Sequence, residues 1–372
     1  MRPSYPFSRR IERRTRYGGI VRVIERFCRG KRADQSLNED GLVITDGFAA
    51  VVDGVTSKSV RHLWQPSGGV VARGLLIEAV GTLPRNATMR ETQMTLDRRL
   101  RAEYARSDAD ESVFVSEPWE RLQANAVVYS AAHREAWLFG DCQIMVNGVQ
   151  TPTLKRVDEL LGEVRSFAAQ AMALDGGMDS ATAQDRMRPP EEPDESDEVV
   201  SDESDGGTEH LPGASIGSVE SPESIKPDES SIGPIEPNAS VASDESSSRT
   251  AVPNQVGRPE AEPDDPARDL IMPFLRLQSR FANRRGTYGY FVFDGFTDPT
   301  YPIRTVPIAP GDEVVLASDG YPLLRPTLAE SERELARLRQ DDPSLIHEYR
   351  STKGFVAGQE SFDDRTYLRF VA

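Results

Sequence analysis

The stretch Phe48-Ala-Ala-Val-Val-Asp-Gly54 is an apolar run that ends in a carboxylate. A strand that is buried on both faces has such a continuous run of apolar residues. Two later runs end in the same way, Trp137-Leu-Phe-Gly-Asp141 and Val314-Val-Leu-Ala-Ser-Asp319. A carboxylate is costly to bury without a partner. The repetition of this arrangement at strand ends therefore indicates cations that the carboxylates share.

Two acidic pairs, Glu39-Asp40 and Asp363-Asp364, extend this pattern along the chain. Oxygen ligands suit Mg²⁺ or Mn²⁺, whereas zinc would favour His or Cys. Dispersed carboxylates can hold two ions about 3.5 to 4 Å apart, and such a pair activates a water for in-line displacement at phosphorus. Each Asp-Gly alone is ordinary turn chemistry. The four histidines show no ligand spacing: His62, His133, His210 and His347.

Eight apolar runs predict strands, and short turns such as Asp46-Gly47 and His133-Arg134 favour antiparallel hairpins between neighbours. The runs are 19–27, 41–44, 48–52, 125–130, 136–139, 287–293, 313–317 and 367–371.

Helices are expected after two capping boxes, Thr88-x-x-Glu91 and Thr327-x-x-Glu330. Apolar spacing predicts two more, over 154–168 and over 270–275 with Pro273 inside it. Strand pairs that are interrupted by helices, without regular βαβ alternation, predict an α+β fold.

Residues 181–266 form a segment of a different composition. Its part from 189 to 266 has no aromatic residue, 12 of the 26 prolines, and 21 acidic against 3 basic residues. Such a segment cannot bury enough apolar surface to offset its ordering, so we expect a disordered acidic insert. It serves either as a solvated spacer or to recruit a regulatory partner and modulate access. The flanking blocks, 19–180 and 267–372, are expected to form one domain.

The acidity of the chain belongs to the insert. The whole chain has a net charge of −16 and residues 189–266 have −18, which leaves +2 for the rest, so the acidity says nothing about the partners of the folded part. No nucleic-acid partner is expected. Residues 1–18 form a basic tail that we expect to be flexible. No secretory signal or membrane span is found, and Cys28 and Cys142 have no CxxC spacing. A cytoplasmic protein is expected.

The order and spacing of the acidic motifs resemble the PPM family, the metal-dependent, type 2C-like serine/threonine protein phosphatases. The motifs are Asn38-Glu-Asp, Val52-Asp-Gly, Gly140-Asp, Ser318-Asp-Gly and Asp363-x-x-Thr366. The resemblance covers most of 20–180 and 267–372. It implies a four-layer α-β-β-α sandwich of two mainly antiparallel sheets, with the metal site between the sheets at one end.

The resemblance also implies a role for each matching residue. Asp53 would bridge two Mn²⁺ or Mg²⁺ ions. Glu39 and the backbone carbonyl of Gly54 would hold one ion, and Asp319 and Asp363 would hold the other.

Two more residues match family positions. Asp40 corresponds to the carboxylate that orients the attacking water, and Asp141 to the position of a third, looser ion. The family's reaction is direct attack on the phosphoryl group of a phosphorylated protein by a water that bridges the two ions, without a covalent phosphoenzyme. The protein's part is then charge neutralisation and positioning.

Several positions depart from the family pattern. Gln35 stands where many members have the arginine that grips phosphate, although Arg32 or Lys31 could substitute for it. Val55-Thr-Ser-Lys58 replaces the usual Gly-Gly, and Lys58 is either a phosphate contact or a solvated lysine. Asp364 replaces an asparagine, and Cys142 a serine. These changes affect the grip on substrate more than the metal ligands.

Two other functions remain open. A phosphatase of the haloacid dehalogenase type would need a nucleophilic Asp two residues before Asp53, where this chain has Val51. A catalytically weak PPM-like fold that acts as a regulatory or binding module would be consistent with Gln35 and the acidic insert. Clustered carboxylates that repel one another argue against such a module, because they are costly without cations.

Overall fold

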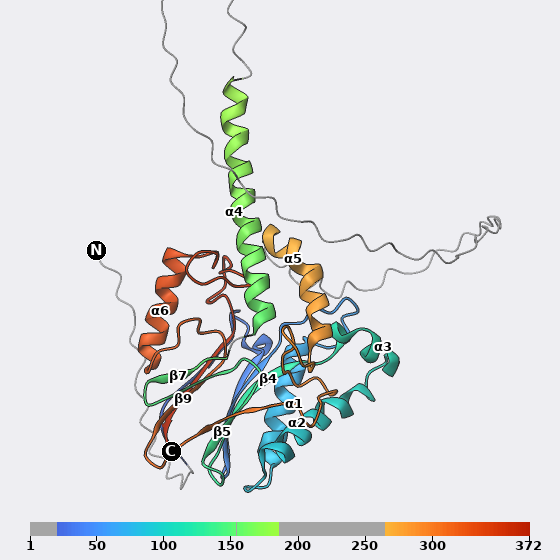
Figure 1. Ribbon diagram of the computed structural model, residues 1–372, viewed down its shortest axis with the longest axis vertical. Coiled ribbons are helices and arrows are strands. Elements are labelled where there is room, and N and C mark those ends of the chain that lie inside the picture. Colours follow the sequence, from blue (N-terminus) through green and yellow to red (C-terminus); the bar gives the residue numbers. More distant parts are fainter. Residues whose placement is uncertain (1–20, 154, 186–264) are drawn as a thin grey trace, which may run out of the picture. The chain divides into compact units, whose positions relative to one another are not determined.

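Two five-stranded antiparallel sheets form the centre of the computed structural model, which describes residues 21–153, 155–185 and 265–372 (Figure 1). One sheet has the order β1-β10-β9-β6-β7, and the other has the order β2-β3-β4-β5-β8. The bounds of the first sheet are β1 (Arg22–Arg29), β10 (Arg365–Val371), β9 (Glu313–Ala317), β6 (Gln143–Val146) and β7 (Val149–Thr151). Those of the second are β2 (Asp40–Ile44), β3 (Phe48–Gly54), β4 (Ala124–Ser130), β5 (Glu135–Phe139) and β8 (Arg304–Pro307).

The two sheets face each other across a buried apolar layer. Successive side chains of a strand point to opposite faces, so Ala49 and Val51 of β3 point to this layer, together with Val127 of β4. Leu316 of β9 and Leu368 of β10 meet them from the other sheet. The side chains at the alternate positions of these strands face the covering helices. Both faces of the strands are therefore buried and apolar.

Helices cover the outer face of each sheet. Helices α1 (Gly68–Thr82) and α2 (Met89–Tyr104) pack through Leu76 and Leu96 on the outer face of the β2–β8 sheet, where Trp137 and Phe139 are fully buried. Helix α6 (Leu328–Asp341) covers the other sheet, with Leu328 against Tyr367 (Figure 1). The predicted α+β class and the four-layer α-β-β-α arrangement are therefore confirmed.

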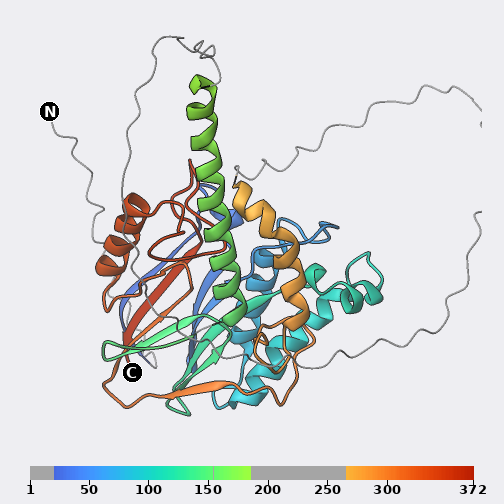
Figure 2. The ribbon, with the colours of Figure 1, turned by 45° about the horizontal axis from the view of Figure 1, so that its top comes forward.

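Two further helices, α4 (Arg156–Asp185) and α5 (Pro266–Leu277), run side by side at one end of the sheets (Figures 1 and 2). Val157 and Leu161 of α4 share an apolar cluster with Ile271 and Leu275 of α5. Arg165 of α4 donates hydrogen bonds of 3.1 and 2.6 Å to the Asp265 carboxylate. The described parts of both halves, 21–185 without residue 154 and 265–372, belong to one unit. The remaining short helices are η1 (Gln35–Leu37), α3 (Glu111–Ser116), η2 (Pro118–Glu120) and η3 (Gln278–Phe281).

Most sequence expectations match these elements, with one clear error. Both predicted capping boxes are present, and all strand pairs are antiparallel. The strand predicted over 287–293 is wrong, because this segment forms only isolated bridges through Tyr290 and Phe293. Its apolar side chains pack on Phe139 instead of extending the sheet.

The predicted basic tail and most of the predicted acidic insert lie outside the described residues. Helix α4 runs to Asp185, five residues past the expected end of the domain at 180. No helix in the described part of the chain is long and apolar enough to cross a membrane.

Candidate metal centre

A cavity of about 530 Å³ opens where β3, β5 and β9 end. Seven carboxylate residues line it, and four of them are the predicted ligands Asp53, Asp141, Asp319 and Asp363; Gly54 lines it as well. These residues come from separate segments and from both sheets. The structure thus brings together the distant acidic residues that the sequence singled out.

Strand periodicity explains why Asp53 points into this cavity. Ala49 and Val51 face the layer between the sheets, and Asp53 is the next residue of the same parity, at the end of β3. On the neighbouring strand β2, Asp40 pairs with Asp53 in the antiparallel register. Both carboxylates therefore lie between the sheets.

Asp40 connects the two sheets behind the cavity. Ser318, which follows β9, donates a hydrogen bond of 2.5 Å to the Asp40 carboxylate and accepts one of 2.9 Å from the Thr366 backbone N–H. Burial raises the pKa of Asp40 well above its ordinary value, and the neighbouring Asp364 carboxylate raises it further. Asp40 is thus buried and fixed between the two sheets.

Glu39 is buried beside Asp40 and held by several donors. The hydroxyl groups of Ser67 and Thr56 donate to its carboxylate at 2.7 and 2.8 Å, and the Lys31 Nζ lies 3.5 Å away. The Asp364 carboxylate accepts backbone N–H groups from both Lys31 and Glu39 at 2.7 Å. These contacts fix the loop before β2 against the start of β10.

Gly54 lies where three backbone segments meet. A Cβ at this position would come within 2.2 Å of the Gly69 carbonyl oxygen and 2.8 Å of the Glu39 carbonyl oxygen. The Gly54 N–H donates to that Glu39 carbonyl at 2.9 Å. A side chain cannot fit here, so the glycine is required by close packing between β3, the loop before β2 and the start of α1.

The carboxylates at the cavity influence each other's pKa. Burial raises the pKa of Asp53 well above its ordinary value, and the charges of Asp319 and Asp40 add to this effect. Burial and the Asp363 charge raise the pKa of Asp319 to about 7. Such mutual repulsion is relieved when a cation binds between the carboxylates.

Lysines already neutralise part of this charge. Burial pushes the pKa of Asp363 upward, but the Lys31 and Lys353 ammonium groups outweigh it and hold that pKa well below its usual range. The Lys31 Nζ lies 3.0 Å from the Asp363 carboxylate, and Lys353 forms a second ion pair with it. The Lys155 Nζ lies 3.4 Å from the Asp141 carboxylate, whose other oxygen is buried without a partner.

The donor set fits a divalent cation in its chemistry. It consists of hard carboxylate oxygens, the pKa values of Asp53 and Asp319 are raised, and one buried oxygen of Asp141 lacks a partner. In the described part of the chain, however, no three Asp, Glu, His or Cys side chains are arranged as a formed metal site. Binding would therefore require Asp363 to exchange its lysine contacts for the cation.

The neighbourhood of Asp53 does not favour an aspartyl-nucleophile phosphatase. Val51, which stands at the position of the nucleophile, is fully buried between the sheets. Asp108 and Asp110 form the only Asp-x-Asp sequence near it; Asp110 caps helix α3 by accepting from Ser112 N–H at 2.8 Å.

Sequence reasoning missed several residues of this site. Ser318, Thr56, Ser67 and Asp364 hold Asp40 and Glu39 in place through contacts between distant segments. The motif order gives no signal for such contacts. The roles of Lys155 and Lys353 were missed as well.

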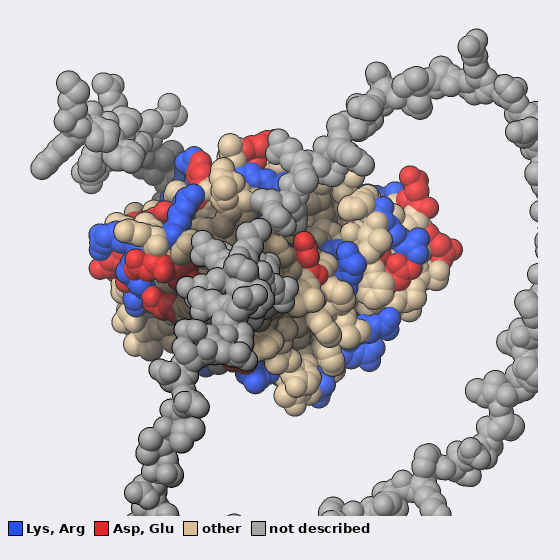
Figure 3. Space-filling model, turned by 90° about the horizontal axis from the view of Figure 1, so that it is seen from above, with Lys and Arg blue, Asp and Glu red and all other residues tan. Residues whose placement is uncertain are grey.

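Basic and acidic side chains alternate around the face seen in Figure 3. A surface of this kind lacks the single-sign stripe that typifies nucleic-acid binding on the face shown.

No family model and no curated protein matches the sequence. Solved structures with a likeness over most of the chain include three phosphatase-related proteins. The catalytic domain of the serine/threonine protein phosphatase PstP, in complex with two manganese ions, has 13% identity, a TM-score of 0.38, and coverage of 94% of this chain and 98% of that chain.

For PppA, a regulatory component of the type VI secretion system in Pseudomonas aeruginosa, the identity is 10% and the TM-score is 0.37. The match covers 94% of this chain and 96% of that chain. For the PPM Ser-Thr phosphatase MsPP from Mycobacterium smegmatis, in complex with cacodylate, the identity is 10% and the TM-score is 0.35. The match covers 94% of this chain and 99% of that chain. The solved structures thus include the family that the motif order resembles. At these TM-scores the likeness carries no inference about the activity of this chain.

Proposed function

We propose that this protein is a metal-dependent phosphatase that hydrolyses phosphomonoesters, with phosphoserine and phosphothreonine of proteins as its substrates. The observation that supports this most is the convergence of Asp53, Asp141, Asp319 and Asp363 on one cavity. Carboxylates from segments so far apart would repel one another there without a functional reason.

Under this proposal, two Mn²⁺ or Mg²⁺ ions would be held at the cavity. Asp53 would contribute to both ions, Glu39 and the Gly54 carbonyl would hold one of them, and Asp319 and Asp363 would hold the other. When bound, such ions neutralise charge on the phosphoryl group and lower the pKa of an attacking water.

The chain's own residues would then orient the attacking water and neutralise charge. Asp40 orients the attacking water, with its carboxylate fixed by the Ser318 hydroxyl. Asp141 provides an oxygen for a third, looser ion. Lys31 and Lys353 neutralise Asp363 when no cation is bound.

The remaining expectations also stand as proposals. We expect the protein to act in the cytoplasm on phosphorylated proteins, without a membrane or nucleic-acid partner. The acidic insert, whose residues 186–264 lie outside the described part of the chain, would recruit a regulatory partner.

The test is hydrolysis of p-nitrophenyl phosphate by the full chain. We expect turnover with added Mn²⁺, none with EDTA, and a loss of at least about 100-fold in Asp53→Asn because the bridging carboxylate charge is reduced. Arg333→Met, an exposed change on α6, serves as the control and should keep full activity. Turnover that persists in EDTA would contradict the proposal.

A second candidate function is a regulatory or binding module with a catalytically weak site. One observation favours it. Lys31 and Lys353 form ion pairs with the Asp363 carboxylate, and no formed metal site exists among the described residues. Calorimetric titration with Mn²⁺ separates the two functions. Metal binding without turnover on any phosphomonoester would support the module.

A further inference from the structure

The lysines of this chain are few and gather at one place. The sequence has 39 arginines and only five lysines. All four lysines of the described residues contact or line the carboxylate cavity, and they come from four separate segments: Lys31, Lys58, Lys155 and Lys353. Arginine supplies the positive charge at the other described positions. A chain that uses arginine almost everywhere has therefore kept lysine where the carboxylates converge.

Lys58 differs from the other three lysines in having no carboxylate partner among the described residues. Lys31 and Lys353 pair with Asp363, and Lys155 pairs with Asp141. The Lys58 ammonium donates one hydrogen bond, of 3.3 Å, to the Thr56 carbonyl oxygen. Two N–H donors of this ammonium are thus left for a ligand.

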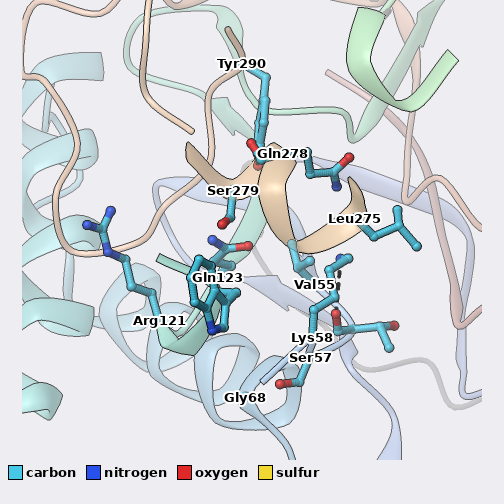
Figure 4. Close-up of a pocket in the computed structure, with 12 residues that line it drawn as sticks. Val55, Ser57, Lys58, Gly68, Arg121, Gln123, Leu275, Gln278, Ser279 and Tyr290 are labelled. Atoms are coloured by element: carbon cyan, nitrogen blue, oxygen red, sulfur yellow. Dashed lines mark hydrogen bonds between the residues drawn. The ribbon is translucent and has the colours of Figure 1, made fainter. Parts of the chain in front are cut away.

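Lys58 stands between two hollows. It lines the large carboxylate cavity and also a smaller one of about 10 Å³, which it shares with Leu275 and Gln278 (Figure 4). Its side chain is only partly exposed. The ammonium is therefore shielded from bulk water but reachable from the large cavity.

The surroundings of Lys58 are unfavourable for a cation. Burial, together with the nearby charges of Lys155, Arg268 and Lys353, lowers the pKa of Lys58 to about 8, against the opposite effect of Asp158. An ammonium without an ion pair among other cations destabilises the fold. Local violations of this kind are typical of functional positions.

An anion with several oxygens would relieve this repulsion. Lysine binds phosphate as a compact point charge, and its slender tip fits a crowded position better than a planar guanidinium does. The cavity volume of about 530 Å³ exceeds what one phosphate needs, so the group that carries the phosphate also fits. Gln35, in contrast, is tied to its own loop by bonds to Gly30 N–H and the Arg32 carbonyl.

We propose that Lys58 anchors an anion subsite, flanked by Lys155 and Lys353, that binds the phosphoryl group of a phosphomonoester beside the carboxylates. The identity of the ligand rests on the proposed function. The subsite itself rests on the cavity and on the unpaired ammonium.

The test is calorimetric titration of the full chain with inorganic phosphate in the presence of Mg²⁺. We expect the Kd of Lys58→Met to rise on the order of tenfold to a hundredfold, as is typical when a hydrogen bond to a charged group is lost. Arg333→Met removes one positive charge from the exposed side of α6 and is the matched control, with an unchanged Kd. Lys58→Arg keeps the charge and should bind more tightly than Lys58→Met.

Thermal unfolding without phosphate separates this role from a structural one. Removal of an unpaired buried ammonium should leave the unfolding midpoint of Lys58→Met equal to or above that of the wild type. A lower midpoint combined with an unchanged Kd would overturn the proposal.

The outcomes also separate the subsite from the proposed function. If the wild type binds phosphate through Lys58 but hydrolyses no phosphomonoester, the subsite stands and the phosphatase proposal fails. If Lys58→Met hydrolyses p-nitrophenyl phosphate with an unchanged KM, the subsite fails and the phosphatase proposal stands.

Discussion

Asp97 is a partly buried carboxylate outside the cavity lining, and its charge is costly. It accepts backbone N–H groups from Gly295 and Thr297 at 2.9 and 3.2 Å. Burial and the charge of Asp294 together raise the pKa of Asp97 to about 6. Asp294 itself is fully buried and is held by Arg121 at 2.9 Å.

A pH dependence follows from Asp97. Because its folded pKa lies above the unfolded value, the folded state binds more protons between about pH 4 and pH 6. The contribution of Asp97 to the free energy of unfolding should therefore fall as pH rises through this window. In urea unfolding, we expect the free energy of unfolding of Asp97→Asn to fall less than that of the wild type as pH rises through this window. The difference should be about 1 to 2 kcal/mol. Asp108→Asn, at an exposed position, is the control and should unfold with the wild-type pH dependence.

Individual site residues were predictable where a motif carried them. Asp53 and Asp319 each end an apolar strand run, and this pattern is visible in the sequence. The lysines were not predictable as a group, because Lys31, Lys155 and Lys353 reach their partners only through tertiary folding. The one sequence signal for a special role of the lysines was that the chain has only five of them beside 39 arginines.

At the scale of single elements, helix α6 depends on its capping box. The Thr327 hydroxyl accepts the Glu330 N–H at 3.3 Å, and the Glu330 carboxylate accepts the Thr327 N–H at 3.2 Å. We expect Thr327→Ala to lower the free energy of unfolding by about 1 kcal/mol, because the Glu330 N–H loses its acceptor and the Glu330 carboxylate loses the hydroxyl donor. Thr327→Ser keeps the hydroxyl and should stay near the wild-type value in chemical unfolding. Equal losses in both variants would contradict this account.

Elements with strong local signals were predicted, and elements with weak signals were missed. Helix α1 was missed because it begins at Gly68-Gly69 and contains Gly74 and Gly81, residues that weaken a helical pattern. The segment 287–293 had a strand-like pattern that tertiary packing overrides. The short strands β6 and β7 carry too few residues for a period to be recognised.

At the scale of the whole molecule, the described apolar clusters account for the fold without residues 186–261. The cluster between the sheets and the one below α1 and α2 draw only on residues before 186 or after 261. We expect replacement of 186–261 by a short Gly/Ser linker to leave the unfolding midpoint and the hydrolysis of p-nitrophenyl phosphate unchanged. Scrambling 186–261 at constant composition is the control. If both variants lost their cooperative unfolding transition, the segment would be part of the domain.

The α+β class was predictable because antiparallel hairpins and apolar strand runs have strong local patterns, whereas the four-layer arrangement was implied by the resemblance of the motif order to the PPM family. The strand order was not predictable, since β10 pairs with β1 although these two strands lie at opposite ends of the sequence. Pairing of that kind is decided by long-range packing, which leaves no periodic trace in a single sequence.

The contact between Arg165 and Asp265 has a consequence for limited proteolysis. The two residues lie on either side of the segment 186–264 and tie α4 to α5 by two hydrogen bonds, over a shared apolar cluster. A single cleavage within that segment would break the chain but not these contacts. The two fragments would then co-elute under native conditions and part only in denaturant, as a nicked yet intact particle.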